Sequence, residues 1–237
     1  MIGIMSEDSY QKVFGNKQRV MAVFAHPDDA ELYAGGTIAR LTVDGKRVRV
    51  VKMTSGGRGS RQENVTEEEL VKTREEEDKK AMSVLGIHNE DNIYLRFRDW
   101  DIENRIEVIG EIAFQIREFQ PEIIITHNPE DVIIRFDKGV NWINHRDHRN
   151  TGLCAIDAAY PYSRDLLFFP KHFAKEGIVP GHVTEFLLTD YYDHPDLVNI
   201  DISDYADRRV EAHATHSSQY DKKAAQNSAD FFTLTPD

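Results

Sequence analysis

Cysteine is nearly absent from this chain. Cys154 is the single cysteine among 237 residues, so the chain cannot form an internal disulfide bond. This excludes a fold held together by disulfides and fits a reducing cytoplasm, where we expect the protein to reside. Residues 1–18 contain no apolar stretch of signal-peptide length. No run approaches 18 apolar residues, so no membrane span is expected.

Positive charge is also scarce. The chain has 29 lysines and arginines against 41 acidic residues, which gives a formal net charge of −12. Nucleic acids and anionic membranes attract basic surfaces, so we do not expect either as a partner. The length and the 40% hydrophobic content suit a globular α/β protein. We expect one domain over residues 19–237, preceded by an N-terminal extension over residues 1–18.

Apolar runs and helical patterns alternate along the chain. The runs around Val50 and Ile124 are continuous, which is typical of strands buried on both faces. Alternation of this kind predicts an α/β fold, a Rossmann-like doubly wound and mostly parallel sheet with helices on both faces. Expected strands are residues 19–25, 47–53, 92–95, 121–127 and 184–191. Expected helices are residues 31–43, 67–85, 102–119, 146–160 and 203–216, with long loops over 128–145 and 160–183.

A histidine and two carboxylates directly follow the first expected strand. Residues 25–31 read Ala-His-Pro-Asp-Asp-Ala-Glu. Open α/β sheets bind ligands at the carboxyl ends of their strands, which is where this segment would lie. His26 and Asp29 are metal-ligand types, and Asp28 is a further carboxylate able to transfer a proton. The segment therefore predicts part of a hydrolytic metal site.

A second polar cluster, His145-Arg146-Asp147-His148, follows the first long loop. His145 and His148 are three positions apart and would share one face of a helix. A hydrolytic zinc site usually has three protein ligands, so we predict that His148 joins His26 and Asp29.

The catalytic residues would then be Asp28, His145 and Asp147. Asp28 would act as general base, and a protonated His145 would stabilise the oxyanion. Asp147 would help to keep that ring charged. Taken alone, the second cluster is most simply a solvated helix N-terminus. The occurrence of two such clusters favours the metal site.

Further segments extend the pattern in order along the chain. They are Gly35-Gly36-Thr37-Ile38-Ala39, Thr54-Ser55-Gly56-Gly57-Arg58-Gly59, Arg74 with Glu77, Pro121 to His127, and His216-Ser217-Ser218-Gln219. Over roughly residues 19–220 the sequence resembles the PIG-L/LmbE-like family of zinc-dependent N-deacetylases. The resemblance implies a Rossmann-like fold, with His26, Asp29 and His148 as zinc ligands. It also implies Asp28 as general base and His145 as the oxyanion-stabilising residue, and it places Arg74 and Asp99 at the substrate.

The resemblance implies a hydrolase that removes acetyl from an N-acetylglucosamine-type conjugate. Its expected cofactor is zinc, with Fe²⁺ as the alternative, and its partner is a small N-acetyl amino sugar. Members of the family are often oligomeric, so a homo-oligomer is expected by analogy. Ala30 stands where the family commonly has glutamate, which resembles the bacillithiol-biosynthesis branch.

Three other functions remain open at this point. An amidase acting on thiol–sugar conjugates could use the same site. A non-catalytic sugar- or metal-binding protein could use the same scaffold, although binding alone does not need Asp28. A nucleotide-binding oxidoreductase would need the Gly-x-Gly-x-x-Gly spacing, which this chain lacks.

Several aromatic residues near the predicted site have open roles. His127 ends an expected strand and is equally a core residue or a support for the ligands. Trp100 and Trp142 fall in expected loops, where packing and stacking on a sugar are both open.

Overall fold

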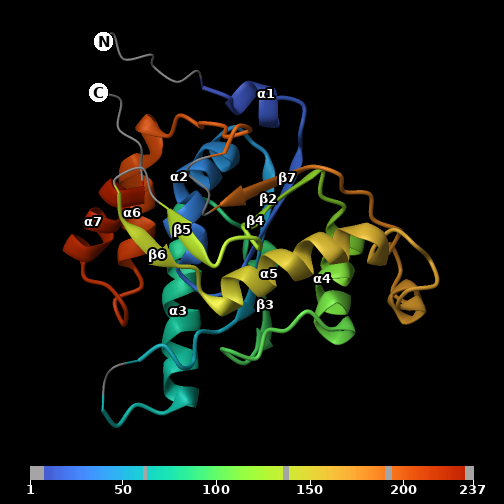
Figure 1. Ribbon diagram of the computed structural model, residues 1–237, viewed down its shortest axis with the longest axis horizontal. Coiled ribbons are helices and arrows are strands. Elements are labelled where there is room, and N and C mark those ends of the chain that lie inside the picture. The colour runs from blue at the N-terminus through green and yellow to red at the C-terminus, as the bar shows by residue number, and fades with distance from the viewer. Residues whose placement is uncertain (1–7, 61–62, 136–138, 190–193, 233–237) are drawn as a thin grey trace.

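A parallel sheet forms the centre of the protein. The computed structural model describes residues 8–60, 63–135, 139–189 and 194–232. In this part of the chain five parallel strands pair in the order β3-β2-β1-β4-β7 (Figure 1). They are β1 (Arg19–Phe24), β2 (Arg47–Thr54), β3 (Asn92–Phe97), β4 (Ile123–His127) and β7 (Phe186–Thr189). The α-helices are α1 (Tyr10–Phe14), α2 (Asp29–Val43), α3 (Glu67–Leu85), α4 (Ile106–Phe119), α5 (Arg146–Asp157), α6 (Ala206–Ala214) and α7 (Lys222–Phe232).

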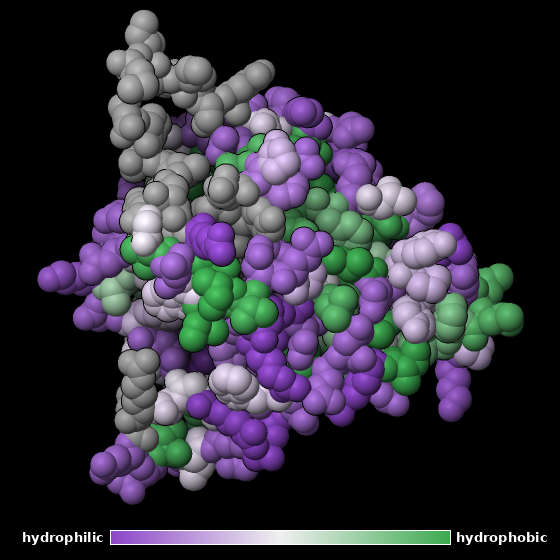
Figure 2. All heavy atoms as spheres, viewed as in Figure 1, coloured by the Kyte–Doolittle hydropathy of each residue, from purple (hydrophilic) through white to green (hydrophobic). Residues whose placement is uncertain are grey.

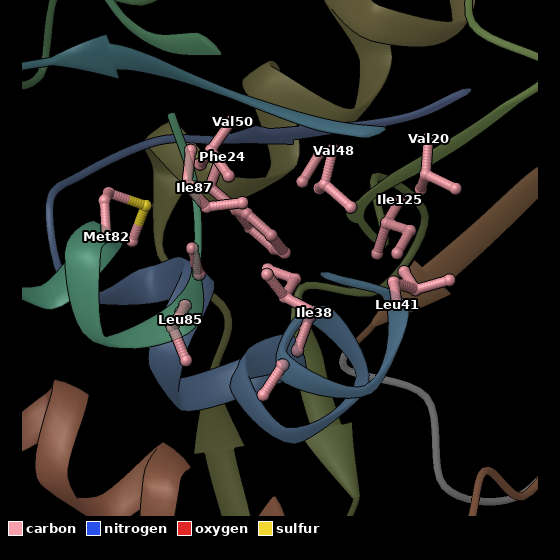
Figure 3. Close-up of a cluster of buried hydrophobic side chains, with 14 of the residues drawn as sticks. Val20, Phe24, Ile38, Leu41, Val48, Val50, Met82, Leu85, Ile87 and Ile125 are labelled. Atoms are coloured by element: carbon pink, nitrogen blue, oxygen red, sulfur yellow. The ribbon is translucent and has the colours of Figure 1, made fainter. Parts of the chain in front are cut away.

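Helices cover both faces of this sheet, as Figure 1 shows. Successive side chains of β1 point to opposite faces. Val20 and Phe24 pack in a core with α2, α3 and α6, whereas Met21 and Val23 pack in a second core with α4 and α5. Figure 3 shows Ile38 of α2 beneath the strands of the first core. The predicted Rossmann-like doubly wound fold is confirmed.

The strand order reverses at β1. This strand pairs with β2 on one side and with β4 on the other. In open α/β sheets such a reversal leaves a crevice outside the carboxyl ends of the two strands. The segment that begins at His26 follows β1, and His127 ends β4. The fold therefore brings these two segments, about a hundred residues apart, to one place.

Local signals explain the ends of helix α3. Thr66 accepts a hydrogen bond from the backbone N–H of Glu69, whose side chain accepts from the Thr66 N–H, so the predicted capping box is present. Gly86 ends the helix at φ 82°, a conformation that glycine adopts without strain. The helix begins and ends where the sequence predicted.

Other boundaries differ from the expectations. Helix α4 begins at Ile106 instead of residue 102, and α5 ends at Asp157, where a π-helical turn, Ala158–Tyr162, continues it into Pro161. The expectation of a loop throughout 128–145 is wrong, because β5 (Ile133–Arg135) and β6 (Asn141–Ile143) pair as an antiparallel hairpin. Strand β7 covers Phe186–Thr189, and residues 190–191 of the expected strand lie outside the described residues.

Two helices were not expected from the sequence. Helix α7 packs against α6, and α1 places Tyr10 and Phe14 in the first core. Helix α1 falls within the segment that we assigned to an N-terminal extension, and the domain boundary after residue 18 stays a prediction. No helix in the described part of the chain combines the length and apolar character needed to cross a membrane.

Candidate metal and catalytic site

Asp29 is the centre of the site. It opens α2, and its side chain is almost completely buried. Its Oδ2 accepts a hydrogen bond from the backbone N–H of His26 at 2.8 Å and lies 3.4 Å from Nδ1 of the same residue. Its Oδ1 lies 3.2 Å from Nε2 of His148. Burial alone would raise the pKa of Asp29, but the histidines around it hold that pKa well below its usual range.

The donor atoms present are suited to a divalent metal. The possible ligand atoms of His26, His145 and His148 all lie within 4.8 Å of one another, as do those of Asp29, His127 and His148. Imidazole nitrogens and a carboxylate oxygen are the donors that zinc and iron accept. His148 belongs to both groups, and Asp29 contacts His26 as well as His148. The predicted set His26, Asp29 and His148 is therefore brought together, and this donor set fits zinc.

His127 also lies in the site. Its Nε2 is 3.3 Å from Asp29 Oδ2, and its ring stacks on that of His148 with centroids 3.9 Å apart. The sequence left its role open between core and support. The structure places it beside two predicted ligands, where it can orient both of them.

Asp28 has an unusual backbone conformation, with φ at 96°, a region that favours glycine. Arg74 holds it there. The Nη2 of Arg74 donates to Asp28 Oδ2 at 2.9 Å and to the Pro27 carbonyl at 2.6 Å. Its Nη1 donates to the Gly56 carbonyl at 3.1 Å, and a Cβ on Gly56 would lie 2.2 Å from that nitrogen. Arg74 is thus a buried clamp on the first loop and not a solvated residue of α3.

Tyr220 is a second partner of Asp28 that sequence reasoning missed. Its side chain hydrogen-bonds with the Asp28 carboxylate. The preceding segment is anchored to α2, because His216 Nε2 lies 2.9 Å from Glu31 Oε1 and both side chains are fully buried. Burial, reinforced by Asp29, raises the pKa of Asp28 to about 6 against the opposing effect of Arg74. The sequence did contain a signal that could have placed Tyr220 at the site, because this residue directly follows the His216–Gln219 motif.

Asp147 contacts both His26 and His145. Asp147 lies 3.3 Å from Nε2 of His26 and accepts the backbone N–H of Trp100 at 2.7 Å. His145 caps α5 through its Nδ1, which accepts the backbone N–H of Asp147 at 3.1 Å. Burial and the neighbouring His26 lower the pKa of His145, which favours a neutral ring with its proton on Nε2. Asp147 therefore orients His26, and its own effect on His145, which raises that pKa as expected, is outweighed by burial and His26.

All predicted site residues except Asp147 line one cavity of about 470 Å³. Asp99 is nearly buried there, and its Oδ2 accepts the backbone N–H of Arg58 at 2.8 Å. Its Oδ1 has no hydrogen-bond partner among the described residues. Leu32, Ile134 and Ser228, which we did not predict, complete the wall from α2, the β5–β6 hairpin and α7.

The site thus combines a buried carboxylate–histidine cluster able to hold a metal ion with a spare carboxylate, at the point where a doubly wound sheet reverses. The family model described as "PIG-L: GlcNAc-PI de-N-acetylase" matches residues 21–159, more than half of the chain. The chain therefore belongs to the PIG-L family, which confirms the resemblance recognised in its sequence.

Individual relatives agree with this assignment. The chain is 30% identical over 211 residues to a diacetylchitobiose deacetylase of Thermococcus kodakarensis, covering 87% of this chain and 72% of that protein. It is 29% identical over 216 residues to a probable N-acetyl-alpha-D-glucosaminyl L-malate deacetylase 2 of Bacillus anthracis, covering 89% and 85%. The solved structure of N,N'-diacetylchitobiose deacetylase from Pyrococcus horikoshii matches with a TM-score of 0.80 at 26% identity, covering 94% of this chain and 78% of that one.

Proposed function

We propose that the protein is a metal-dependent N-deacetylase that removes acetyl from an N-acetylglucosamine-type conjugate. The observation that carries this proposal is the different setting of two adjacent carboxylates. Asp29 contacts three histidines, whereas Asp28 contacts Arg74 and Tyr220 at the cavity wall. A binding protein needs the first carboxylate only, but a hydrolase also needs a base. The named activities of the relatives support the same reaction class.

In this proposal His26, Asp29 and His148 hold a zinc ion, with Fe²⁺ as the alternative. When bound, the ion lowers the pKa of a water molecule and polarises the amide carbonyl. His127 and Asp147 contact these ligands and fix their orientation.

The remaining steps belong to the cavity residues. Asp28 accepts the proton of the attacking water and passes it to the departing amine, while Arg74 and Tyr220 hold its carboxylate in place. Neutral His145 donates a hydrogen bond from Nε2 to the oxygen of the tetrahedral intermediate. Asp99 accepts a sugar hydroxyl through Oδ1, the oxygen that has no partner among the described residues. Arg74 lines the same cavity, where it acts through the Asp28 carboxylate that it binds.

The test compares Asp28→Asn with Asp29→Asn. Both variants and the wild type are assayed for metal content and for amine release from N-acetyl sugars, with and without added zinc. Asp28→Asn should keep about one metal per chain and lose about 10²–10⁴-fold in turnover. Asp29→Asn should lose metal, and excess zinc should restore part of its activity. Asp196→Asn, which alters an exposed carboxylate, is the matched control.

Two results would reject this assignment. Near-normal turnover by metal-loaded Asp28→Asn would remove the base from the mechanism. Metal binding without amine release from any N-acetyl sugar would favour the non-catalytic alternative. An amidase of thiol–sugar conjugates would instead release amine from those conjugates faster than from simple N-acetyl sugars.

A further inference from the structure

Trp100 occupies a strained position at the rim of the cavity. It lies just beyond β3 with φ at 69°, a conformation that bulky residues rarely adopt. Its backbone N–H donates to Asp147 Oδ2 at 2.7 Å, and its carbonyl accepts from the guanidinium of Arg146. Strain of this kind persists only where surrounding contacts enforce it, and it occurs mainly at functional sites. Here those contacts come from the same motif that supplies His145 and His148.

The strain presents an aromatic side chain to the cavity. Trp100 is 55% exposed and lines the cavity, and its ring lies against that of His145, with centroids 4.5 Å apart. The position of Trp100 beside a predicted catalytic ring indicates contact with a ligand.

Trp142 lines the same cavity from the β5–β6 hairpin. It is 59% exposed and stands opposite Ile134 in the hairpin register, and its neighbour Ile143 is also exposed and lines the cavity. Figure 2 shows apolar atoms over this hairpin on a mostly hydrophilic face. The sequence contains two tryptophans, and both of them line this cavity.

The arginines that line the cavity already have hydrogen-bond partners within the protein. Of the described residues that line it, the arginines and lysines are Arg58 and Arg74. Arg74 binds Asp28 and two carbonyls, and Arg58 binds Glu67 and the Asp99 carbonyl. The net charge of −12 further disfavours an anionic group. An aglycone with a carboxylate would have to compete with Asp28 for Arg74 or with Glu67 for Arg58.

We propose that Trp100 and Trp142 form a subsite for a second, uncharged sugar ring joined to the N-acetyl sugar that reacts. The C–H face of a pyranose is apolar and packs on an indole, while its hydroxyls remain hydrated at the open rim. This deepens the proposed function and rests on it for the position of the reacting sugar. It assigns a neutral disaccharide, and not a carboxylate-bearing conjugate, as the preferred substrate class.

Binding is tested by tryptophan fluorescence, which here reports on the cavity alone. The Asp28→Asn variant, loaded with zinc so that substrate persists, is titrated with N,N'-diacetylchitobiose, N-acetylglucosamine and N-acetylglucosaminyl malate. The disaccharide should change the emission and bind about 3- to 10-fold more tightly than either other probe. Single-tryptophan proteins, made with Trp100→Phe and Trp142→Phe, assign the change to each ring.

Turnover gives a second measurement. In otherwise wild-type protein, Trp100→Gly and Trp142→Ala should each reduce the preference in kcat/KM for the disaccharide over N-acetylglucosamine by about 3- to 10-fold. Glycine adopts φ 69° without strain, so Trp100→Gly removes the ring while favouring the same backbone. Leu167→Ala, at a side chain that is 93% exposed and outside the cavity lining, is the control.

The outcomes separate the two proposals. Equal binding of all three probes, preference for the malate conjugate, or an unchanged preference in both tryptophan variants would overturn the subsite. Selective disaccharide binding without amine release would support the subsite and reject the deacetylase. Amine release without any disaccharide preference would support the deacetylase and reject the subsite.

Discussion

Asp147 lies behind His26, with its Oδ2 3.3 Å from the Nε2 of that histidine. The two residues are 121 positions apart in the sequence and meet because β1 ends beside the start of α5. Asp147 is fully buried, and its other oxygen has no hydrogen-bond partner among the described residues. A carboxylate placed against a ligating histidine fixes the orientation of the ring and makes it a stronger ligand.

Replacing Asp147 with asparagine should therefore weaken metal binding. The amide is nearly isosteric and can still accept the Trp100 N–H, but it lacks the charge that supports His26. We expect zinc affinity to fall about 10- to 100-fold, measured by competition with a chromophoric chelator. Asp157→Asn, on the same helix, is the comparison. An unchanged affinity for zinc would show that Asp147 matters only for the Trp100 turn.

His127 and His148 stack on each other, yet we expect their replacement to affect metal binding differently. His148→Gln should strip the metal, because His148 belongs to both groups of possible ligand atoms. His127→Gln keeps a polar side chain beside Asp29 and should reduce affinity by no more than about 10-fold. Elemental analysis after dialysis measures both. Equal metal loss in the two variants would make His127 a ligand and would revise the predicted set.

Arg74→Lys should impair turnover and leave metal content intact. A lysine carries the charge but cannot reach Asp28, the Pro27 carbonyl and the Gly56 carbonyl at once. The base would lose its fixed position, and we expect kcat/KM to fall about 10- to 100-fold. Arg98→Lys, at an exposed pair with Glu67, controls for the substitution itself. Wild-type kinetics in Arg74→Lys would contradict the clamp.

The fold was predictable because its signals are local. Continuous apolar runs, the capping box at Thr66 and Gly86 each depend on a few adjacent residues, and all appear where expected. The β5–β6 hairpin was not predictable, because strands of three residues have no detectable period.

The site was predictable to the extent that its residues stand in two short motifs. The contacts of Asp147 with His26 and of Tyr220 with Asp28 join distant segments, and spacing carries no information about them. His145 and Asp147 stand two positions apart in one motif, which suggested a charged pair, but the Asp147 carboxylate contacts His26 and only its backbone N–H reaches the His145 ring. The resident metal, an oligomeric state and a cytoplasmic location stay predictions.

A buried ion pair beneath the site provides a prediction about stability. Lys52 Nζ lies 2.9 Å from Asp78 Oδ2, with both side chains fully buried, and the hydroxyl of Tyr94 donates to the same oxygen. Burial would raise the pKa of Asp78, but Lys52 and Tyr94 outweigh it and lower that pKa. The contacts thus stabilise the ionised carboxylate in the folded protein.

Tyr94→Phe should therefore destabilise the protein in a pH-dependent way. The folded pKa of Asp78 lies below the unfolded value of about 3.9, so this stabilisation is complete above that value and is lost as the pH falls through the folded pKa. We expect Tyr94→Phe to lower the free energy of unfolding by about 2 kcal/mol at pH 7. The deficit should shrink below about pH 4, where the Asp78 carboxyl becomes protonated first in the unfolded chain. Urea unfolding at pH 7, 5 and 3.5 measures this, with Tyr160→Phe at an exposed ring as the control. A deficit that stays constant across this range would assign the loss to packing and not to the charged carboxylate.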